Sequence, residues 1–291
     1  MPDDDGEDPV APERLGFVQR SALRRLRKAA GRADGEPLAA EDWAVLWELE
    51  HSLTNRFTHR VWRALPADPR CQMCAAPFAG VGRFATRALG FRPSRKNPNM
   101  CSMCIELSPP GGAKMLTGVL FADLRGFTRS SEHADPEDVS RVLRRFYGCA
   151  EKTLFPEAII DKLIGAEAMA LYLHPVLPRA DIPRLMVDHA RRLLRAVGYG
   201  TPAGPFVEVG VGIDFGEAFV GNIGQRDVYD FTAVGDVVNT ASRLQGQAAG
   251  GQIVVAERAV GTRLDDGAER IEVELKGKDR PVAAHRITVD P

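Results

Sequence analysis

The stretch from Met115 to Glu132, which reads MLTGVLFADLRGFTRSSE, constrains this chain more than any other. Its apolar run, Val119–Ala122, is typical of a buried strand. Asp123 stands at the end of that run, directly before a turn centred on Gly126. A carboxylate beside a glycine turn can hold Mg²⁺ while the amides of the turn bind phosphate oxygens. The stretch therefore predicts a site for a metal-bound polyphosphate or, more plainly, a strand that ends in an Asp-capped turn.

Two later stretches favour the first interpretation. One is Asp161–Ala170, which reads DKLIGAEAMA, and the other runs from Gly216 to Arg243 and contains YDFTAVGDVVNTASR. In this order the three stretches resemble the class III nucleotidyl cyclase family, the adenylyl and guanylyl cyclases. The resemblance extends from about Ala113 to the C-terminus. It implies an enzyme, a lyase that forms a 3′,5′-cyclic nucleotide and pyrophosphate from a nucleoside triphosphate.

The resemblance also implies a site for two Mg²⁺ or Mn²⁺ ions. The first aspartate of the family pattern matches Asp123, with the Leu124 carbonyl as the expected backbone ligand. The second aspartate of the pattern follows the glycine of the middle motif, and Ala166 stands there in this chain. With that carboxylate missing, we expect weak activity or none. Glu167 is the only nearby substitute. Because neighbours on a strand point to opposite faces, we expect Glu167 to replace the missing ligand only if the hairpin turn relaxes that rule.

Four further residues match the positions that read the base and stabilise the transition state. Lys162 lies three residues before the hairpin glycine, where the family carries Lys for adenine and Glu for guanine. Thr232 matches its partner position. Asn239 and Arg243, one helical turn apart, match the pair that positions the ribose and stabilises charge on the α-phosphate. The set favours an adenylyl cyclase acting on ATP over a guanylyl cyclase.

The remaining phosphate-binding candidates are the glycine turn and basic residues of the C-terminal part: Gly126, Phe127, Thr128, Arg226, Lys276 and Lys278. In the family, the metal-binding residues come from one subunit and the base-reading and transition-state residues from the other. The resemblance thus implies a homodimer with two shared sites related by two-fold symmetry. A second hypothesis, favoured by Ala166, is a cyclase-like protein that binds nucleotide or a partner without turnover.

The periodicity of residues 113–291 predicts the fold independently. Strands and helices are expected in the order β-α-β-β-α-β, at about 115–122, 136–150, 157–163, 167–173, 181–197 and 207–213. This order is the ferredoxin-like arrangement of the α+β class. A helix at about 236–247 and strands near 252–255, 270–275 and 282–288 extend the sheet. The same fold is what the resemblance implies.

Four cysteines upstream form two pairs, Cys71 with Cys74 and Cys101 with Cys104. Each pair places two sulfurs on one turn, and four thiolates together suit tetrahedral zinc or an iron–sulfur cluster. Free thiols or two unrelated redox pairs are the alternative. A metal at this place would stabilise the module of residues 67–108, which is too short to rely on its own core.

The N-terminal part carries weaker signals. Residues 1–12 are acidic and predict disorder, whereas residues 13–66 predict a pair of helices whose apolar stripe packs in a core or dimerises. The first of these helices carries five basic residues: Arg20, Arg24, Arg25, Arg27 and Lys28. Such a run predicts a solvated face or an acidic partner. The formal net charge of -1 gives no indication of nucleic acid. With no signal peptide and no long apolar run, we expect a cytoplasmic protein without a membrane span.

Overall fold

The computed structural model describes residues 17–43, 45–46, 60–62, 64–65, 69–94, 99–105, 107–127, 131–132, 134–174, 177, 180–225, 228–261, 264 and 267–290. The predictions for residues 1–12, for most of the second helix, for Thr128 and for Arg226 lie outside this set, as does the side chain of Lys162. The chain divides into two compact units. The first unit comprises residues 1–114 and 219–232, and the second comprises residues 115–218 and 233–291. No helix within the described ranges is long and apolar enough to cross a membrane.

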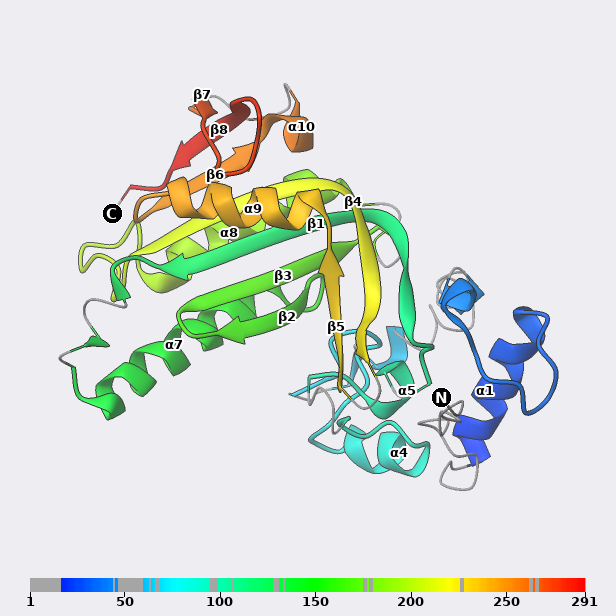
Figure 1. Cartoon of the computed structure of the whole chain (residues 1–291). Coiled ribbons are helices and arrows are strands. Elements are labelled where there is room, and N and C mark those ends of the chain that lie inside the picture. Colours follow the sequence, from blue (N-terminus) through cyan, green and yellow to red (C-terminus); the bar gives the residue numbers. More distant parts are fainter. Residues whose placement is uncertain are drawn as a thin grey trace. The chain divides into compact units, whose positions relative to one another are not determined.

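The predicted β-α-β-β-α-β order is present (Figure 1). Its elements are β1 (Gly111–Leu124), α7 (Pro136–Leu154), β2 (Ile159–Ile164), β3 (Glu167–Leu173), α8 (Ile182–Val197) and β4 (Val209–Gln225). Asp135 caps α7 by accepting a hydrogen bond from the Glu137 amide at 2.8 Å, and Pro136 suits the first helical position. The ferredoxin-like α+β prediction is confirmed, and both β1 and β4 are longer than predicted.

The chain continues through β5 (Val228–Val234), α9 (Asp236–Gln247), β6 (Gln252–Ala256), α10 (Glu257–Val260), β7 (Glu269–Val273) and β8 (Val282–Thr288). The strand order is β2-β3-β1-β4-β6-β8-β7, and β5 pairs with β4 beside this path. The β4–β5 hairpin was not predicted, because glycines interrupt its apolar alternation. Only glycine fits at position 221, because the backbone of Gly111 comes very close: a Cβ at Gly221 would lie 2.2 Å from the Gly111 carbonyl oxygen.

Side-chain alternation along the strands sorts residues between the two faces of the sheet. Leu120, Ala122 and Leu124 of β1 belong to the main core, which α7 and α8 complete with large apolar side chains such as Phe146 and Met186. On the other face, α9 packs over β6 with Leu244, Ala248, Val254 and Ala256. The backbone of α9 comes so close to β4 that a Cβ at Gly212 would lie 2.2 Å from the Gln245 nitrogen. Asp123 alternates with Ala122 and Leu124 and therefore points away from the α7–α8 core.

The first unit contains α1 (Phe17–Ala29), the 3₁₀ turn η2 (Ala40–Asp42), α4 (Gly82–Ala88) and α5 (Ser102–Ile105). Leu23 of α1 packs with Leu107, and the buried Trp43 donates its indole N–H to the Pro109 carbonyl at 3.1 Å. Four of the basic residues of α1 are exposed as predicted, namely Arg20, Arg24, Arg25 and Lys28. Arg27 is a correction to that prediction: it is buried, because it falls on the packed side of α1 beside Leu23 and Leu26.

Candidate active site and cysteine centre

Asp123 lies at the end of β1 and forms an ion pair with Arg125, whose Nη2 is 2.7 Å from the Asp123 Oδ2. The next residue, Leu124, donates its amide to the Ala166 carbonyl at 3.1 Å, so the end of β1 is tied to the β2–β3 turn. Gly126 has a φ of +67°, which glycine adopts without strain and which the predicted turn requires. A carboxylate and a glycine turn are therefore adjacent at one end of the strand.

Glu167 is the direct cross-strand partner of Asp123 in the antiparallel pairing of β1 with β3. Cross-strand partners have Cβ atoms about 5 Å apart on the same face of the sheet. Burial and the neighbouring Asp123 raise the pKa of Glu167, although Arg125 opposes that shift. Ala166 lies in the turn and packs against the main core. The observed register thus places Glu167, and not Ala166, opposite Asp123.

The predicted base-reading residues lie on β2 and β5. The backbone of Lys162 pairs with Met169 of β3, next to an irregularity in the β2–β3 register. The turn that follows has Gly165 at a φ of +58°, and the Tyr147 hydroxyl of α7 donates to the Gly165 carbonyl. Thr232 is buried on β5 within the first unit. The pairing of Lys162 with Thr232 at a base remains a prediction.

The transition-state pair lies on α9. Asn239 is exposed and Arg243 is half-buried. A Cβ at Gly277 would lie 3.5 Å from the Arg243 Nη2, so the guanidinium lies against the turn that contains Lys276 and Lys278. The structure therefore brings together two parts of the predicted phosphate site that are more than thirty residues apart in the sequence. Lys276 is exposed and forms no ion pair with another described residue, whereas Lys278 pairs with the Asp236 carboxylate.

A charged network beside α9 was not predicted. Asp214 of β4 is fully buried, and Arg258 donates to both of its oxygens, with Nε 2.9 Å from Oδ1. Arg258 also bonds Asp236, the first residue of α9, at 3.2 Å. Burial raises the pKa of Asp214 despite this partner, and the hydrogen bond from Lys278 lowers the pKa of Asp236. The sequence did contain a signal for this network, because Asp214 is a carboxylate within an otherwise apolar run of residues.

The two halves of the predicted site lie apart within one chain. A Cβ at Gly210 would be 2.7 Å from the Ala248 carbonyl oxygen and 3.0 Å from the Arg125 Nε, so Arg125 lies by the C-terminal end of α9. Asn239 precedes Ala248 by nine residues, which is roughly 14 Å along a helix axis. The metal-binding candidate Asp123 and the transition-state candidate Asn239 thus lie near opposite ends of α9 within one chain.

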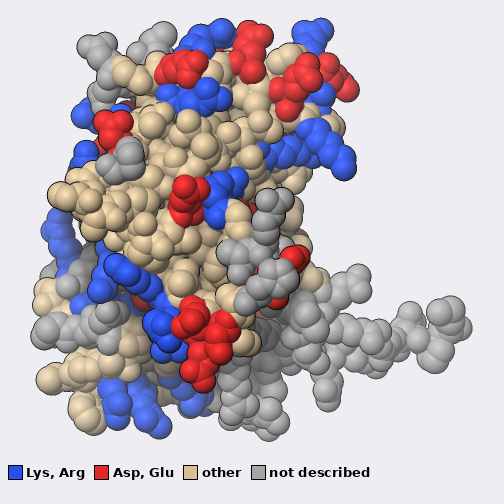
Figure 2. Space-filling view, turned by 90° about the vertical axis from the view of Figure 1, so that its left-hand side faces the viewer, with Lys and Arg blue, Asp and Glu red and all other residues tan. Residues whose placement is uncertain are grey.

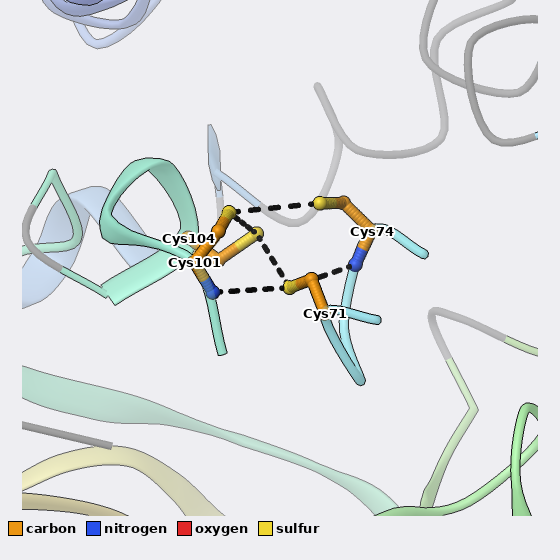
Figure 3. Close-up of side chains that lie close together, drawn as sticks. All are labelled: Cys71, Cys74, Cys101 and Cys104. Atoms are coloured by element: carbon orange, nitrogen blue, oxygen red, sulfur yellow. Dashed lines mark hydrogen bonds between the residues drawn. The ribbon is translucent and has the colours of Figure 1, made fainter. Parts of the chain in front are cut away.

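The four paired cysteines converge in the first unit (Figure 3). All four are buried, and no disulfide links them. Cys71 Sγ lies 3.8 Å from Cys104 Sγ, Cys74 Sγ lies 3.6 Å from Cys101 Sγ, and the Cys101 and Cys104 sulfurs are 3.4 Å apart. The amides of Cys101 and Cys74 donate to Cys71 Sγ at 3.2 and 3.5 Å. Two turns distant in sequence therefore place four sulfurs around one point.

The spacing of the sulfurs tests which metal group fits. Four ligands at a zinc–sulfur distance of about 2.3 Å form a tetrahedron whose edges are about 3.8 Å. The measured separations of 3.4 to 3.8 Å are close to that edge. In an iron–sulfur cluster the four cysteines are shared between two or four irons, which requires wider separations between some of the sulfurs than those found here, where all four lie within 4.8 Å of one another. The donor set fits a single tetrahedral ion.

Comparison with known proteins assigns the family. Residues 114–287 match the model of the adenylate and guanylate cyclase catalytic domain. The match covers more than half of the chain, and the chain therefore belongs to this family.

Individual relatives match a similar share of the chain. An adenylate cyclase from Anabaena cylindrica is 30% identical over 184 residues, which are 58% of this chain and 36% of the relative. An adenylate cyclase from Mycobacterium tuberculosis is 29% identical over 163 residues, which are 55% of this chain and 37% of the relative. The chain thus spans little more than a third of the length of these relatives.

Two solved structures share the fold. The guanylyl cyclase Cya2 superimposes with a TM-score of 0.53 at 28% identity, over 61% of this chain and 93% of that structure. The adenylyl cyclase CyaB from P. aeruginosa superimposes with a TM-score of 0.52 at 26% identity, over 62% of this chain and 96% of that structure. Because one acts on guanine and the other on adenine nucleotides, the fold similarity leaves the choice of base to individual residues.

Proposed function

We propose that this chain is an adenylyl cyclase of low turnover that converts ATP to cyclic AMP and pyrophosphate, with a zinc-stabilised N-terminal module that regulates it. The observation that carries the proposal is the end of β1, where Asp123 stands beside the Gly126 turn and opposite Glu167. A divalent cation bound there neutralises charge on the triphosphate and lowers the pKa of the 3′-hydroxyl. Asp123 and the Leu124 carbonyl would hold the cation.

The other residues act on the nucleotide directly. The amides of the Gly126–Phe127 turn donate to phosphate oxygens. Arg243 and the neighbouring Lys276 place positive charge where the α-phosphate and pyrophosphate develop negative charge. Asn239, one turn before Arg243, orients the ribose. Lys278 joins this group when it leaves Asp236 for a phosphate.

Lys162 and Thr232 support ATP as the substrate. A lysine donates hydrogen bonds and accepts none, which suits an acceptor on the edge of adenine in the family pattern. A guanylyl cyclase, which the pattern associates with glutamate at this position, is the weaker alternative.

The separation of Asp123 from Asn239 along α9 supports a homodimer with shared sites. One chain supplies the metal side and its partner supplies Asn239, Arg243 and Lys162, so two-fold symmetry generates two sites. Light scattering with a nucleotide analogue and Mn²⁺ tests this assembly. A protein that stays monomeric at tens of micromolar would contradict it.

Zinc is the ion that we propose for Cys71, Cys74, Cys101 and Cys104, since the sulfur spacing fits a single tetrahedral ion. Such a closed four-thiolate site contributes folding energy and leaves no open position for catalysis. A single iron in the same ligand set is distinguished by its visible absorbance, and elemental analysis of the purified chain separates the two.

A catalytically silent nucleotide-binding protein is the second candidate, and Ala166 is the observation that favours it. Cyclase assays with ATP and GTP, under Mg²⁺ and under Mn²⁺, separate the candidates when the unaltered chain and Ala166→Asp are compared. Cyclic AMP formation by the unaltered chain supports the enzyme. Tight nucleotide binding without product in either protein supports the silent alternative.

A further inference from the structure

The short helix α4 (Gly82–Ala88) carries an apolar stripe on its exposed side. Val81, Phe84, Ala85 and Ala88 recur at the spacing of one helical face, and all four are exposed. Val81 is 82% exposed and Phe84 is 71% exposed. The packed side of the helix holds Gly82 and Thr86. A stripe with this spacing normally faces a core, so its exposure indicates a surface that another molecule covers.

Arginines border the stripe. Arg83 and Arg87 stand four residues apart, and the Arg83 guanidinium lies over the Phe84 ring at 5.4 Å from its centroid. Residues 69–105 contain six basic and no acidic residues. Even with four thiolates bound to a divalent ion, which together carry two negative charges, this segment stays positive. A second copy of the same face would repel it.

A small cavity opens beside the stripe. Its volume is about 210 Å³, and its lining includes Arg83, Arg87 and Arg92 together with Phe78 and Phe91. This volume is below the range of about 300 Å³ and above that is usual for whole small-molecule ligands. It accommodates one phosphate group with part of its ester. Figure 2 shows a group of Lys and Arg side chains at the lower edge of its view.

We propose that the α4 face docks on an anionic phospholipid surface, with a lipid phosphate in the arginine-lined cavity and with Val81 and Phe84 in the interfacial layer. Apolar side chains flanked by arginines are the combination that such a layer favours. A polyanion such as DNA would form ion pairs with the arginines, but it would leave the apolar side chain of Val81 exposed to water. A protein partner needs a patch of about 800 Å², far larger than two side chains supply.

Vesicle co-sedimentation tests the proposal on the full, zinc-loaded chain. We expect binding to phosphatidylcholine vesicles that contain phosphatidylglycerol, weaker binding at high salt, and little binding to pure phosphatidylcholine. Val81→Ser with Phe84→Ser should lower the affinity at least about tenfold, since each buried side chain of this kind contributes that factor or more. Arg83→Gln with Arg87→Gln should lower the affinity and flatten its salt dependence.

Matched controls separate docking from folding. Leu116→Ser removes an exposed apolar side chain on β1, and Arg144→Gln removes an exposed arginine on α7; neither should change vesicle binding. Each variant should keep its zinc content and melting temperature. A Val81 and Phe84 variant that loses zinc or unfolds early would show that the stripe is covered within the protein, which overturns the proposal.

Three further outcomes also overturn it. One is equal binding to neutral and anionic vesicles, and another is tighter binding to duplex DNA than to vesicles. The third concerns a free ligand: if millimolar glycerol 3-phosphate binds the cavity tightly while anionic vesicles do not bind, the cavity serves a soluble phosphate ester. If glycerol 3-phosphate only weakly displaces vesicle-bound protein, the bilayer supplies the rest of the affinity, as proposed.

Discussion

Asp123 and Glu167 face each other across the β1–β3 pairing, whereas Ala166 packs against the core. Two carboxylates directly opposite each other are unfavourable without a cation. Arg125 forms an ion pair with Asp123 and only partly opposes the rise in the pKa of Glu167. The pair therefore offers a second carboxylate near the place where the family pattern has an aspartate.

Substitutions at positions 166 and 167 should separate their contributions. Glu167→Gln should weaken Mn²⁺ binding about tenfold in the presence of a non-cyclisable ATP analogue, measured by electron paramagnetic resonance, because it removes one charged ligand. Ala166 lies in the turn before β3, where strand alternation does not fix the direction of a side chain. Ala166→Asp should therefore raise turnover by about two orders of magnitude with little change in nucleotide affinity, since a positioned cation contributes several kcal/mol. Tyr147→Phe, which removes only a hydrogen bond to the turn, is the control for local disturbance.

Unchanged Mn²⁺ affinity in Glu167→Gln would exclude Glu167 from the metal site. If the unaltered chain already turns over at the rate of Ala166→Asp, the missing aspartate is not limiting.

The preference for ATP over GTP should depend on the side chain of Lys162. The unaltered chain, or Ala166→Asp if turnover is too slow to measure, should prefer ATP over GTP. Lys162→Glu should reduce that preference, because it replaces a hydrogen-bond donor by an acceptor at the base edge. Competition between the two nucleotides in a binding assay gives the ratio directly. Lys152→Glu on α7 makes the same change of charge away from the base and should leave the ratio unaltered.

Loss of one of the four thiolate ligands should destabilise the module of residues 67–108. Cys104→Ser should lower bound zinc well below one ion per chain, since a closed site needs all four ligands. The second unit should keep its fold, because its core is built from other residues. Cys149→Ser, which removes a cysteine of α7 outside the cluster, should leave zinc content unchanged. Fully folded, metal-free protein would refute the assignment.

His189 should make stability depend on pH. It is fully buried, its Nδ1 lies 2.9 Å from the Tyr172 hydroxyl, and its Nε2 has no hydrogen-bond partner within the described residues. Burial lowers its pKa from 6.5 to about 4. Between these values the unfolded chain binds a proton that the folded chain does not, so stability falls as the pH falls from 6.5 to 4. The loss amounts to at most about 3 kcal/mol.

Urea unfolding at several pH values measures this slope. His189→Gln should flatten it between pH 4 and 6.5, whereas His174→Gln, at an exposed position, should not. An unchanged slope in His189→Gln would show that other groups cause the pH dependence.

The sequence determined the order of the core elements of the second unit and the identity of the motif residues. Hydrophobic periodicity is local, and it located α9 at its observed residues and β8 at Val282–Thr288. Spacing alone also indicated that Cys71, Cys74, Cys101 and Cys104 converge, since each pair already shares one turn. The βαββαβ order followed from the alternation of strand-like and helix-like segments.

Only the tertiary structure decided which residues meet across the sheet. The register of β1 against β3 places Glu167 opposite Asp123, and a shift of one residue would have reversed that result. The bond network of Asp214, Arg258 and Asp236 joins β4, α10 and α9, so no local pattern contains it. The exposure of Val81 and Phe84 likewise depends on what packs around α4. Apolar residues at helical spacing can lie on a buried face or on an exposed one, so the sequence pattern does not distinguish the two.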